Sequence, residues 1–156
     1  TLTTVANYRD ICEFIQGSLG QLGWSIAVDI VPSATLRGQK SAGTLDFFRA
    51  SWIADYPDPE NYVLLFASMM KAPSGPNYSR YTNQEYDLLY EQLVTTTIDS
   101  VKLDLARKAD ALLMQDAACV PLYYDEVFRV YPKGMRGLKT NALNALLLNE
   151  VILPKK

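Results

Sequence analysis

The sequence has no histidine, only two cysteines and almost no net charge, and each scarcity narrows the functions it can have. Without histidine the chain cannot build a histidine-dependent catalytic triad, and it lacks the commonest general base and zinc ligand. Its 15 basic and 17 acidic residues give a formal charge of -2, so the basic excess of a general nucleic-acid binder is missing. We therefore expect neither histidine-based catalysis nor binding to nucleic acid.

Cysteine and long apolar runs are equally scarce. Cys12 and Cys119 lie far apart, and neither has a second ligand at Cys-x-x-Cys spacing, so no metal site is predicted. Both fit small buried side chains, and a disulfide between them stays open because sequence does not give its geometry. No Gly-rich phosphate loop or nucleophile elbow is present, so no cofactor is predicted either. No apolar run approaches the roughly 18 residues of a transmembrane helix.

Hydrophobic spacing predicts alternating helices and strands, which is typical of an α/β fold. Helices are expected at 5–22, 33–43, 59–70, 83–95 and from about 100 to 113, and strands at 24–30, 45–53 and 120–131. The apolar segment at 145–153 fits a strand or a short buried helix. Thr82 with Glu85 fits a capping box for the fourth helix, and Lys102 is expected on the solvated face of the fifth. The chain begins inside a predicted helix without an initiator methionine, so we expect it to be a fragment.

The most informative stretch is DFFRASWIADYPDPENY, from Asp46 to Tyr62. It predicts a strand, a proline-bracketed turn and a helix start, and rigid loops at the carboxyl ends of strands are where open α/β folds place ligands. Asp55 could pair there with a cationic group of a ligand, because a charge-assisted hydrogen bond is strong when desolvated. Trp52 could supply apolar area or a cation–π face beside it, and Tyr56 is the neighbouring candidate.

Each of these residues also has a purely structural interpretation. Asp58 before Pro59 fits a helix N-cap better than a ligand contact. Asp55 could bond to its own backbone in an Asx-turn, Trp52 could belong to the core, and Tyr56 could form a local hydrogen bond.

The order of motifs along the chain resembles a known family. SWIADYPDPENY is similar to the W-x-x-D-Y-x-D-P signature of extracytoplasmic solute-binding proteins of the oligopeptide and dipeptide ABC transporter family. NYSRYTNQEYDLLYEQL resembles the family's N-x-x-x-Y-x-N-x-x-Y-D-x-L segment. ARKADALLMQDAACVPLYYDEVFRVY resembles its helix followed by a P-L-Y-Y strand, and KGMRGLKTNA resembles a later turn. The resemblance covers nearly the whole chain.

This resemblance implies a fold and an organisation. The expected fold is a periplasmic-binding-protein-like α/β lobe, the second of two, with a mixed sheet flanked by helices. Residues 1–127 would form most of that lobe. Residues 128–156 would be a tail that crosses back to the missing first lobe, where 139–153 would pair.

The resemblance also implies a function. In peptide-binding members, the aspartate of W-x-x-D pairs with the ligand's α-amino group; that position is Asp55 here, with Trp52 and Tyr56 beside it. The chain would then be part of the substrate-binding component of an ABC importer, not an enzyme, delivering peptides or similar solutes to membrane permease subunits. It would work outside the cytoplasm, in the periplasm or at the cell surface, with or without a lipid anchor.

Three alternatives stand beside this prediction. The same scaffold could bind a nickel complex, an oligosaccharide or haem in place of a peptide. A carboxylate-dependent hydrolase could use Asp55 and Asp58 as acid and base, although both lie in one tight turn and a helix cap already explains Asp58. A purely structural interaction domain would have no cleft near Trp52.

Overall fold

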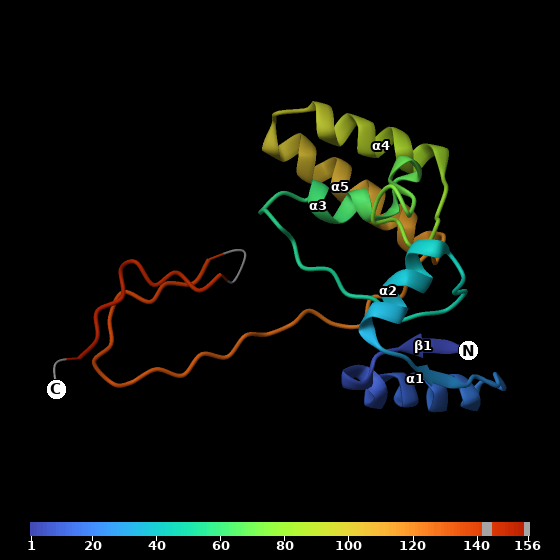
Figure 1. The fold of residues 1–156 in the computed structure, drawn as a ribbon. Helices are drawn as coiled ribbons and strands as arrows, with labels where there is room; N and C mark the ends of the chain where they lie inside the picture. The colour runs from blue at the N-terminus through green and yellow to red at the C-terminus, as the bar shows by residue number, and fades with distance from the viewer. Residues whose placement is uncertain (142–144, 155–156) are drawn as a thin grey trace.

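The computed structural model describes residues 1–141 and 145–154 of the chain. Its first layer is a small parallel sheet of β1 (Leu2–Thr4) and β2 (Val28–Ile30), between α1 (Arg9–Gln21) and α2 (Ser33–Ala42) (Figure 1). A 3₁₀ turn, η1 (Ala6–Tyr8), leads from β1 into α1. The helix predicted at 33–43 is confirmed, and so is the body of the opening helix. The predicted start of the chain inside that helix is wrong, because residues 2–4 pair as β1 and the α-helix begins only at Arg9.

The predicted strand at 24–30 is shorter in the structure, and the one at 45–53 is reduced to a bridge. Phe48 makes a single parallel bridge to Thr3, supported by Arg49 N–H donating to Thr3 O at 3.0 Å. Since β1 is only three residues long and turns at once into η1 and α1, it offers no longer ladder to either neighbour. Hydrophobic spacing thus predicted extended segments at both places but not the lengths of the strands.

The second layer consists of helices packed on one core. It contains α3 (Glu60–Val63), the 3₁₀ turns η2 (Leu64–Phe66) and η3 (Ser68–Met70), α4 (Gln84–Thr95) and α5 (Asp99–Gln115). The buried cluster between them contains Val63, Ala67, Tyr86, Tyr90, Leu93, Leu105, Ala109 and Leu113. The single helix predicted at 59–70 is wrong in form, because the α-helical turn gives way to 3₁₀ turns after Val63. The helices predicted at 83–95 and from about 100 to 113 are confirmed, and their buried apolar residues face this core.

The cap of α4 differs from the prediction. The Asn83 side chain, not that of Thr82, accepts hydrogen bonds from Glu85 N at 2.9 Å and Tyr86 N at 3.2 Å. Asparagine is as good a cap as serine or threonine, so a Thr-Asn pair leaves the choice to the local backbone.

The other residues of this motif serve the fold as well. Buried Asn77 donates to the carbonyls of Ala67 and Tyr81, at 3.0 and 3.1 Å. The Tyr86 hydroxyl donates to Val63 O at 2.8 Å, and Asp87 accepts from Ser68 N at 2.8 Å. These polar side chains therefore stabilise the helical layer through hydrogen bonds within it, at positions of the N-x-x-x-Y-x-N-x-x-Y-D segment.

Arg80 joins the two layers. Its guanidinium donates to Ser41 O near the end of α2 and to Ala72 O before α4, each at 3.1 Å. Gly43, which ends α2 in the left-handed conformation at φ +71°, leaves room for that guanidinium. A Cβ on Gly43 would lie 2.1 Å from Arg80 Nε.

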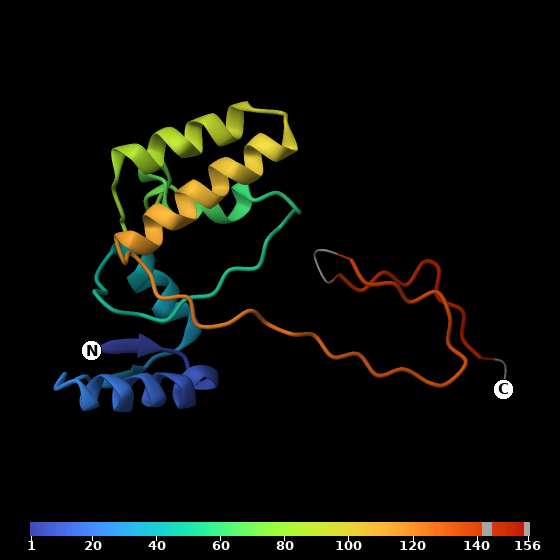
Figure 2. The same ribbon diagram turned by 180° about the vertical axis from the view of Figure 1, so that it is seen from behind.

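Beyond Cys119 the chain leaves both layers. It runs outward as an extended segment and doubles back on itself (Figures 1 and 2). The strand predicted at 120–131 and the strand or short helix predicted at 145–153 do not form: among the described residues from 120 to 154 a single bridge is found, between Arg136 and Ile152. A strand needs a partner ladder, and the described part of the tail finds none alongside it. Apolar side chains such as Phe128 consequently remain exposed.

Two further findings concern the cysteines and the membrane. Cys12 and Cys119 are both free thiols; Cys12, on α1, is fully buried as predicted, whereas Cys119 is only partly buried. Among residues 1–141 and 145–154, none of the helices combines the length and the apolar character that crossing a bilayer requires.

Candidate functional site

The loop that contains the predicted site residues connects the two layers. It leaves the sheet at Arg49 and reaches α3 at Glu60, and Figure 1 shows it as the long segment running between the sheet and α3. We call residues 50–59 the connecting loop. Two prolines restrict its backbone, and Asp58 N–H donates to Tyr56 O at 3.0 Å inside it. The predicted residues Trp52, Asp55 and Tyr56 all lie on this loop.

Asn61, in the first turn of α3, holds the connecting loop. Its Oδ1 accepts one hydrogen bond from Trp52 Nε1 at 2.8 Å and a second from Asp55 N at 3.3 Å. Asn61 is only 2 % exposed, so this oxygen sits among protein atoms and depends on those donors. Trp52 is thus neither free nor a simple core residue, because its ring is partly buried and its N–H is tied to α3.

The carboxylate of Asp55 is exposed and available. Its backbone N–H is held by Asn61, but within the described residues no donor reaches its side chain. The Asx-turn interpretation of Asp55 is therefore wrong. A carboxylate on a fixed backbone, with its oxygens unoccupied, can accept hydrogen bonds from a cationic group without first breaking internal ones.

Tyr56 bonds locally, as its structural interpretation predicts, while its ring stays partly exposed. Its hydroxyl donates to Glu60 Oε2, and this bond is the main reason that the pKa of Tyr56 lies above its usual value. Tyr90 donates to the other oxygen of Glu60 at 3.1 Å. Burial, with a further contribution from Glu60, raises the pKa of Tyr90 to about 12. Glu60 therefore connects the exposed Tyr56 to a core tyrosine.

Asp58 is a structural residue in this fold. Its Oδ1 accepts from Glu60 N at 2.9 Å, as a cap does, and its Oδ2 lies 2.5 Å from Lys102 Nζ of α5. The bond from Lys102, followed by that from Glu60 N, lowers the pKa of Asp58. The solvated position predicted for Lys102 is wrong, since the lysine is partly buried in this ion pair. With both oxygens occupied, Asp58 is poorly placed to act with Asp55 as an acid–base pair.

Arg49 occupies the start of the connecting loop. Its guanidinium carbon lies 3.3 Å from the centroid of the Tyr8 ring, a cation–π contact. It also donates to Ser51 Oγ at 3.2 Å and to Tyr123 OH at 3.4 Å. Arg49 thus links the loop to η1 and to the extended segment that follows Cys119.

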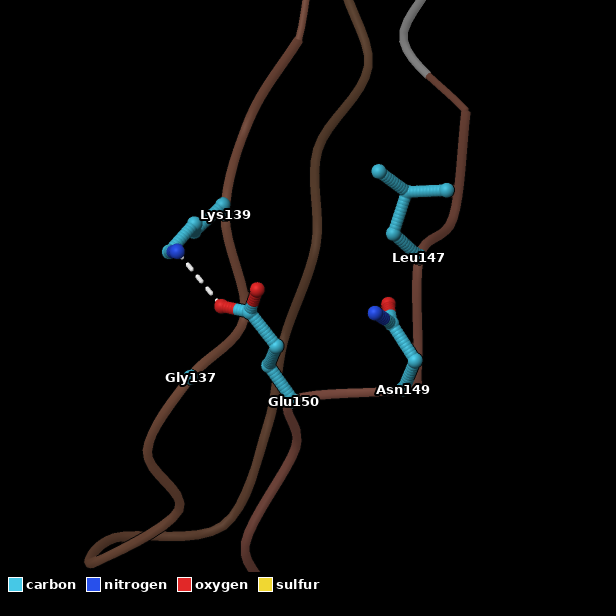
Figure 3. A pocket seen from close by; sticks show the side chains of 5 residues that line it. All are labelled: Gly137, Lys139, Leu147, Asn149 and Glu150. Atoms are coloured by element: carbon cyan, nitrogen blue, oxygen red, sulfur yellow. Dashed lines mark hydrogen bonds and ion pairs between the residues drawn. The ribbon is translucent and has the colours of Figure 1, made fainter.

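Two hollows in the surface lie elsewhere. One of about 80 Å³ is enclosed by the folded-back tail and lined by Gly137, Lys139, Leu147, Asn149 and Glu150 (Figure 3). The exposed ion pair of Lys139 with Glu150, at 2.5 Å, closes one side of it. A second, of about 220 Å³, lies beside Arg129 and Tyr131. Both are gaps between extended segments of the tail, and neither includes a residue of the connecting loop.

Sequence reasoning missed Glu60 and Asn61, the two residues on which the loop depends. Both stand inside the quoted motif, but the motif attracts attention to its aspartates and aromatic residues. The signal was an asparagine and a glutamate in the first turn of a short helix directly after the loop. Only the packing of α3 against α4 and α5 turns those polar side chains toward the loop.

Comparison with known proteins places these features in context. The chain is 23% identical over 92% of its length to "Di/tripeptide-binding protein 4" of Pseudomonas aeruginosa, covering 27% of that protein. It is 30% identical over 66% of its length to "Periplasmic oligopeptide-binding protein OppA" of Salmonella typhimurium, covering 18% of it. No family model matches the chain. The chain therefore spans about a quarter or less of the length of these curated relatives.

Solved structures also resemble this chain over part of their own length. A structure titled "peptide ABC transporter, peptide-binding protein" superposes with a TM-score of 0.64 at 28% identity, over 76% of this chain and 55% of that one. HbpA2 from Haemophilus parasuis superposes over 99% of this chain and 32% of its own, with a TM-score of 0.79. At 19% identity this second likeness shows the fold alone. The fold is that of a periplasmic-binding-protein-like α/β lobe, as the sequence predicted, but the sheet of β1 and β2 is parallel where a mixed sheet was expected.

Proposed function

We propose that this chain, which is homologous to part of the dipeptide- and oligopeptide-binding periplasmic proteins, supplies part of the substrate-binding component of an ABC importer. It binds peptides or similar solutes outside the cytoplasm and presents them to the permease subunits in the membrane. The relatives are named as binding proteins, and the proposed role likewise needs no reaction at the site.

The observation that supports the proposal is an exposed carboxylate on the connecting loop. Asp55 offers an exposed carboxylate without an internal partner among the described residues, on a backbone held by a buried asparagine. A peptide's α-amino group is the cation that such a carboxylate suits, because three N–H donors can share its oxygens. Trp52 and Tyr56 flank it with partly exposed rings that can cover the first residue of the peptide.

The tail completes the proposed organisation. In this organisation residues 1–127 belong to one lobe, whose packed layers end near Cys119, and the segment from 128 onward extends toward a second lobe. Support comes from the exposed apolar side chains of the tail, such as Phe128 and Val130, which gain a buried position only against a further surface. In such a protein the ligand is enclosed when the two lobes close about a hinge.

The test compares peptides with and without a free amino group. In the polypeptide of the relatives' length that carries this chain, calorimetry should show binding of trialanine and much weaker binding of N-acetyl-trialanine. Asp55→Ala should weaken the binding of trialanine by about 2–5 kcal/mol, as expected when one partner of a desolvated ion pair is removed. Asp110→Asn, an exposed carboxylate on α5, serves as the matched control and should leave the affinity unchanged.

Equal affinity for the two peptides would remove Asp55 from this role. Binding of a nickel complex, an oligosaccharide or haem without any binding of peptides would retain the scaffold and replace the proposed ligand. The 156-residue chain alone should bind trialanine weakly or not at all, because it provides only one wall of the cleft.

A further inference from the structure

We propose that Asn61 is the positioning residue of the candidate site, which fixes Trp52 and Asp55 in the arrangement that ligand binding requires. The inference rests on the proposed function for its meaning, but its first test needs no ligand. Asn61 does not itself reach the ligand in this account. It acts by accepting two donors from the connecting loop on one buried oxygen.

The geometry of Asn61 Oδ1 is specific to this task. An amide oxygen has two lone pairs, and here they receive the indole N–H of Trp52 and the backbone N–H of Asp55. The two donors are three residues apart, so the oxygen pins both ends of the Trp-x-x-Asp turn at once. The direction in which the Asp55 carboxylate leaves the loop follows from that double attachment.

The position of the oxygen is itself set by the helical layer. Val63, two residues further along α3, is buried in the core of α4 and α5. Asp58, three residues earlier, is paired with Lys102 of α5 at 2.5 Å. Residues on both sides of Asn61 are thus held by contacts with α5. Asn61 in turn fixes the connecting loop, which packs no buried cluster of its own.

Loss of the acceptor should therefore act on the loop more than on the fold. Leucine has the branched shape of asparagine with a larger volume, so Asn61→Leu keeps the space filled but leaves both N–H groups without a partner. These donors would turn toward water, and the turn would move with them. Asn61→Asp is the conservative variant, because in either protonation state one of its oxygens can accept a hydrogen bond.

The two tryptophans of the chain make this measurable by NMR. Trp52 Nε1 is bonded to Asn61, whereas Trp24 is 66 % exposed and no acceptor for its indole is recorded in the described part of the chain. In the unmodified chain the indole proton of Trp52 should exchange with solvent more slowly than that of Trp24. Asn61→Leu should remove this difference, and Asn61→Asp should largely preserve it.

Val63→Ala is the matched control on the same helix. It should lower the melting temperature by opening a cavity in the core, yet leave the slow exchange of the Trp52 indole in place. Equal exchange of the two indoles in the unmodified chain would overturn the proposal, even if Asn61→Leu failed to fold. Persistence of the slow exchange in a folded Asn61→Leu chain would overturn it as well.

The link to binding is tested in the polypeptide of the relatives' length. Asn61→Leu should weaken trialanine binding by about tenfold or more. In an Asp55→Ala background the same change should cost no more than about threefold, since a residue that acts through Asp55 has little left to affect. Equal losses in the two backgrounds would refute the claim that Asn61 acts on binding by positioning Asp55. If the unmodified polypeptide binds no peptide, the proposed function fails, while the indole exchange still decides the role of Asn61.

Discussion

Gly43→Ala should destabilise the chain by breaking the junction between its two layers. The residue has φ +71°, and alanine in the left-handed region costs about 1 kcal/mol relative to glycine. The new Cβ would also lie 2.1 Å from Arg80 Nε, so the guanidinium must leave its place. Arg80 would then lose its bonds to Ser41 O and Ala72 O, which are worth about 1 kcal/mol together at an exposed site. We expect a total loss of about 2 kcal/mol.

Gly38→Ala provides the matched control for this change. Gly38 lies inside α2, and a Cβ there would meet nothing within 4 Å. Alanine in a helix interior should stabilise the chain by about 0.5–1 kcal/mol. Urea unfolding followed by circular dichroism would then separate the two variants by about 3 kcal/mol. In an Arg80→Ala background only the backbone cost at position 43 should remain, about 1 kcal/mol.

The result that would refute this reasoning is an equal shift of the urea midpoint in the two glycine variants. An unchanged cost of Gly43→Ala in the Arg80→Ala background would preserve the backbone argument and reject the role of the guanidinium.

Three further predictions concern pH and the tail. The pKa of Asp58 is lowered from 3.8 by Lys102, so the contribution of Asp58 to stability is present above that value and is lost as pH falls. Asp58→Asn should therefore be less stable than the parent chain at pH 7, and the difference in unfolding free energy should close in acid. The pKa of Tyr90 is raised to about 12, so stability falls as pH rises from 10 toward 12; Tyr90→Phe should reduce that alkaline loss, whereas an unchanged pH profile would contradict it. Removal of residues 120–156 should leave the melting temperature within a few degrees, because this segment adds little to either core.

Local chemistry in the sequence was enough for much of the fold. The spacing of Tyr86, Tyr90 and Leu93 indicated which side of α4 is buried, and the structure places all three in the core. Gly43 was expected to end the second helix, and it does so in the left-handed conformation. These features depend on residues within one or two turns of each other, so their interactions are visible as spacing.

The errors occurred where a segment depends on a distant partner. The segment at 120–131 has the composition of a strand, but an extended segment becomes a strand only beside another that pairs with it, and the described chain supplies none there. Lys102 was expected in solvent because its own helix gives no sign of Asp58, which lies forty-four positions away on the connecting loop. Contacts between residues so far apart in the sequence cannot be read from the composition of either segment.

For the candidate site, the sequence by itself determined which residues lie there: a tryptophan, an aspartate and a tyrosine on a proline-bracketed loop. Only the tertiary structure decided their states. In the folded chain both oxygens of Asp58 accept hydrogen bonds, and the Tyr56 hydroxyl donates to Glu60. The carboxylate of Asp55 is exposed to solvent. The physical reason is that a side chain's availability depends on which donors and acceptors packing brings within 3 Å, and here packing brings Asn61 and Lys102 from other elements.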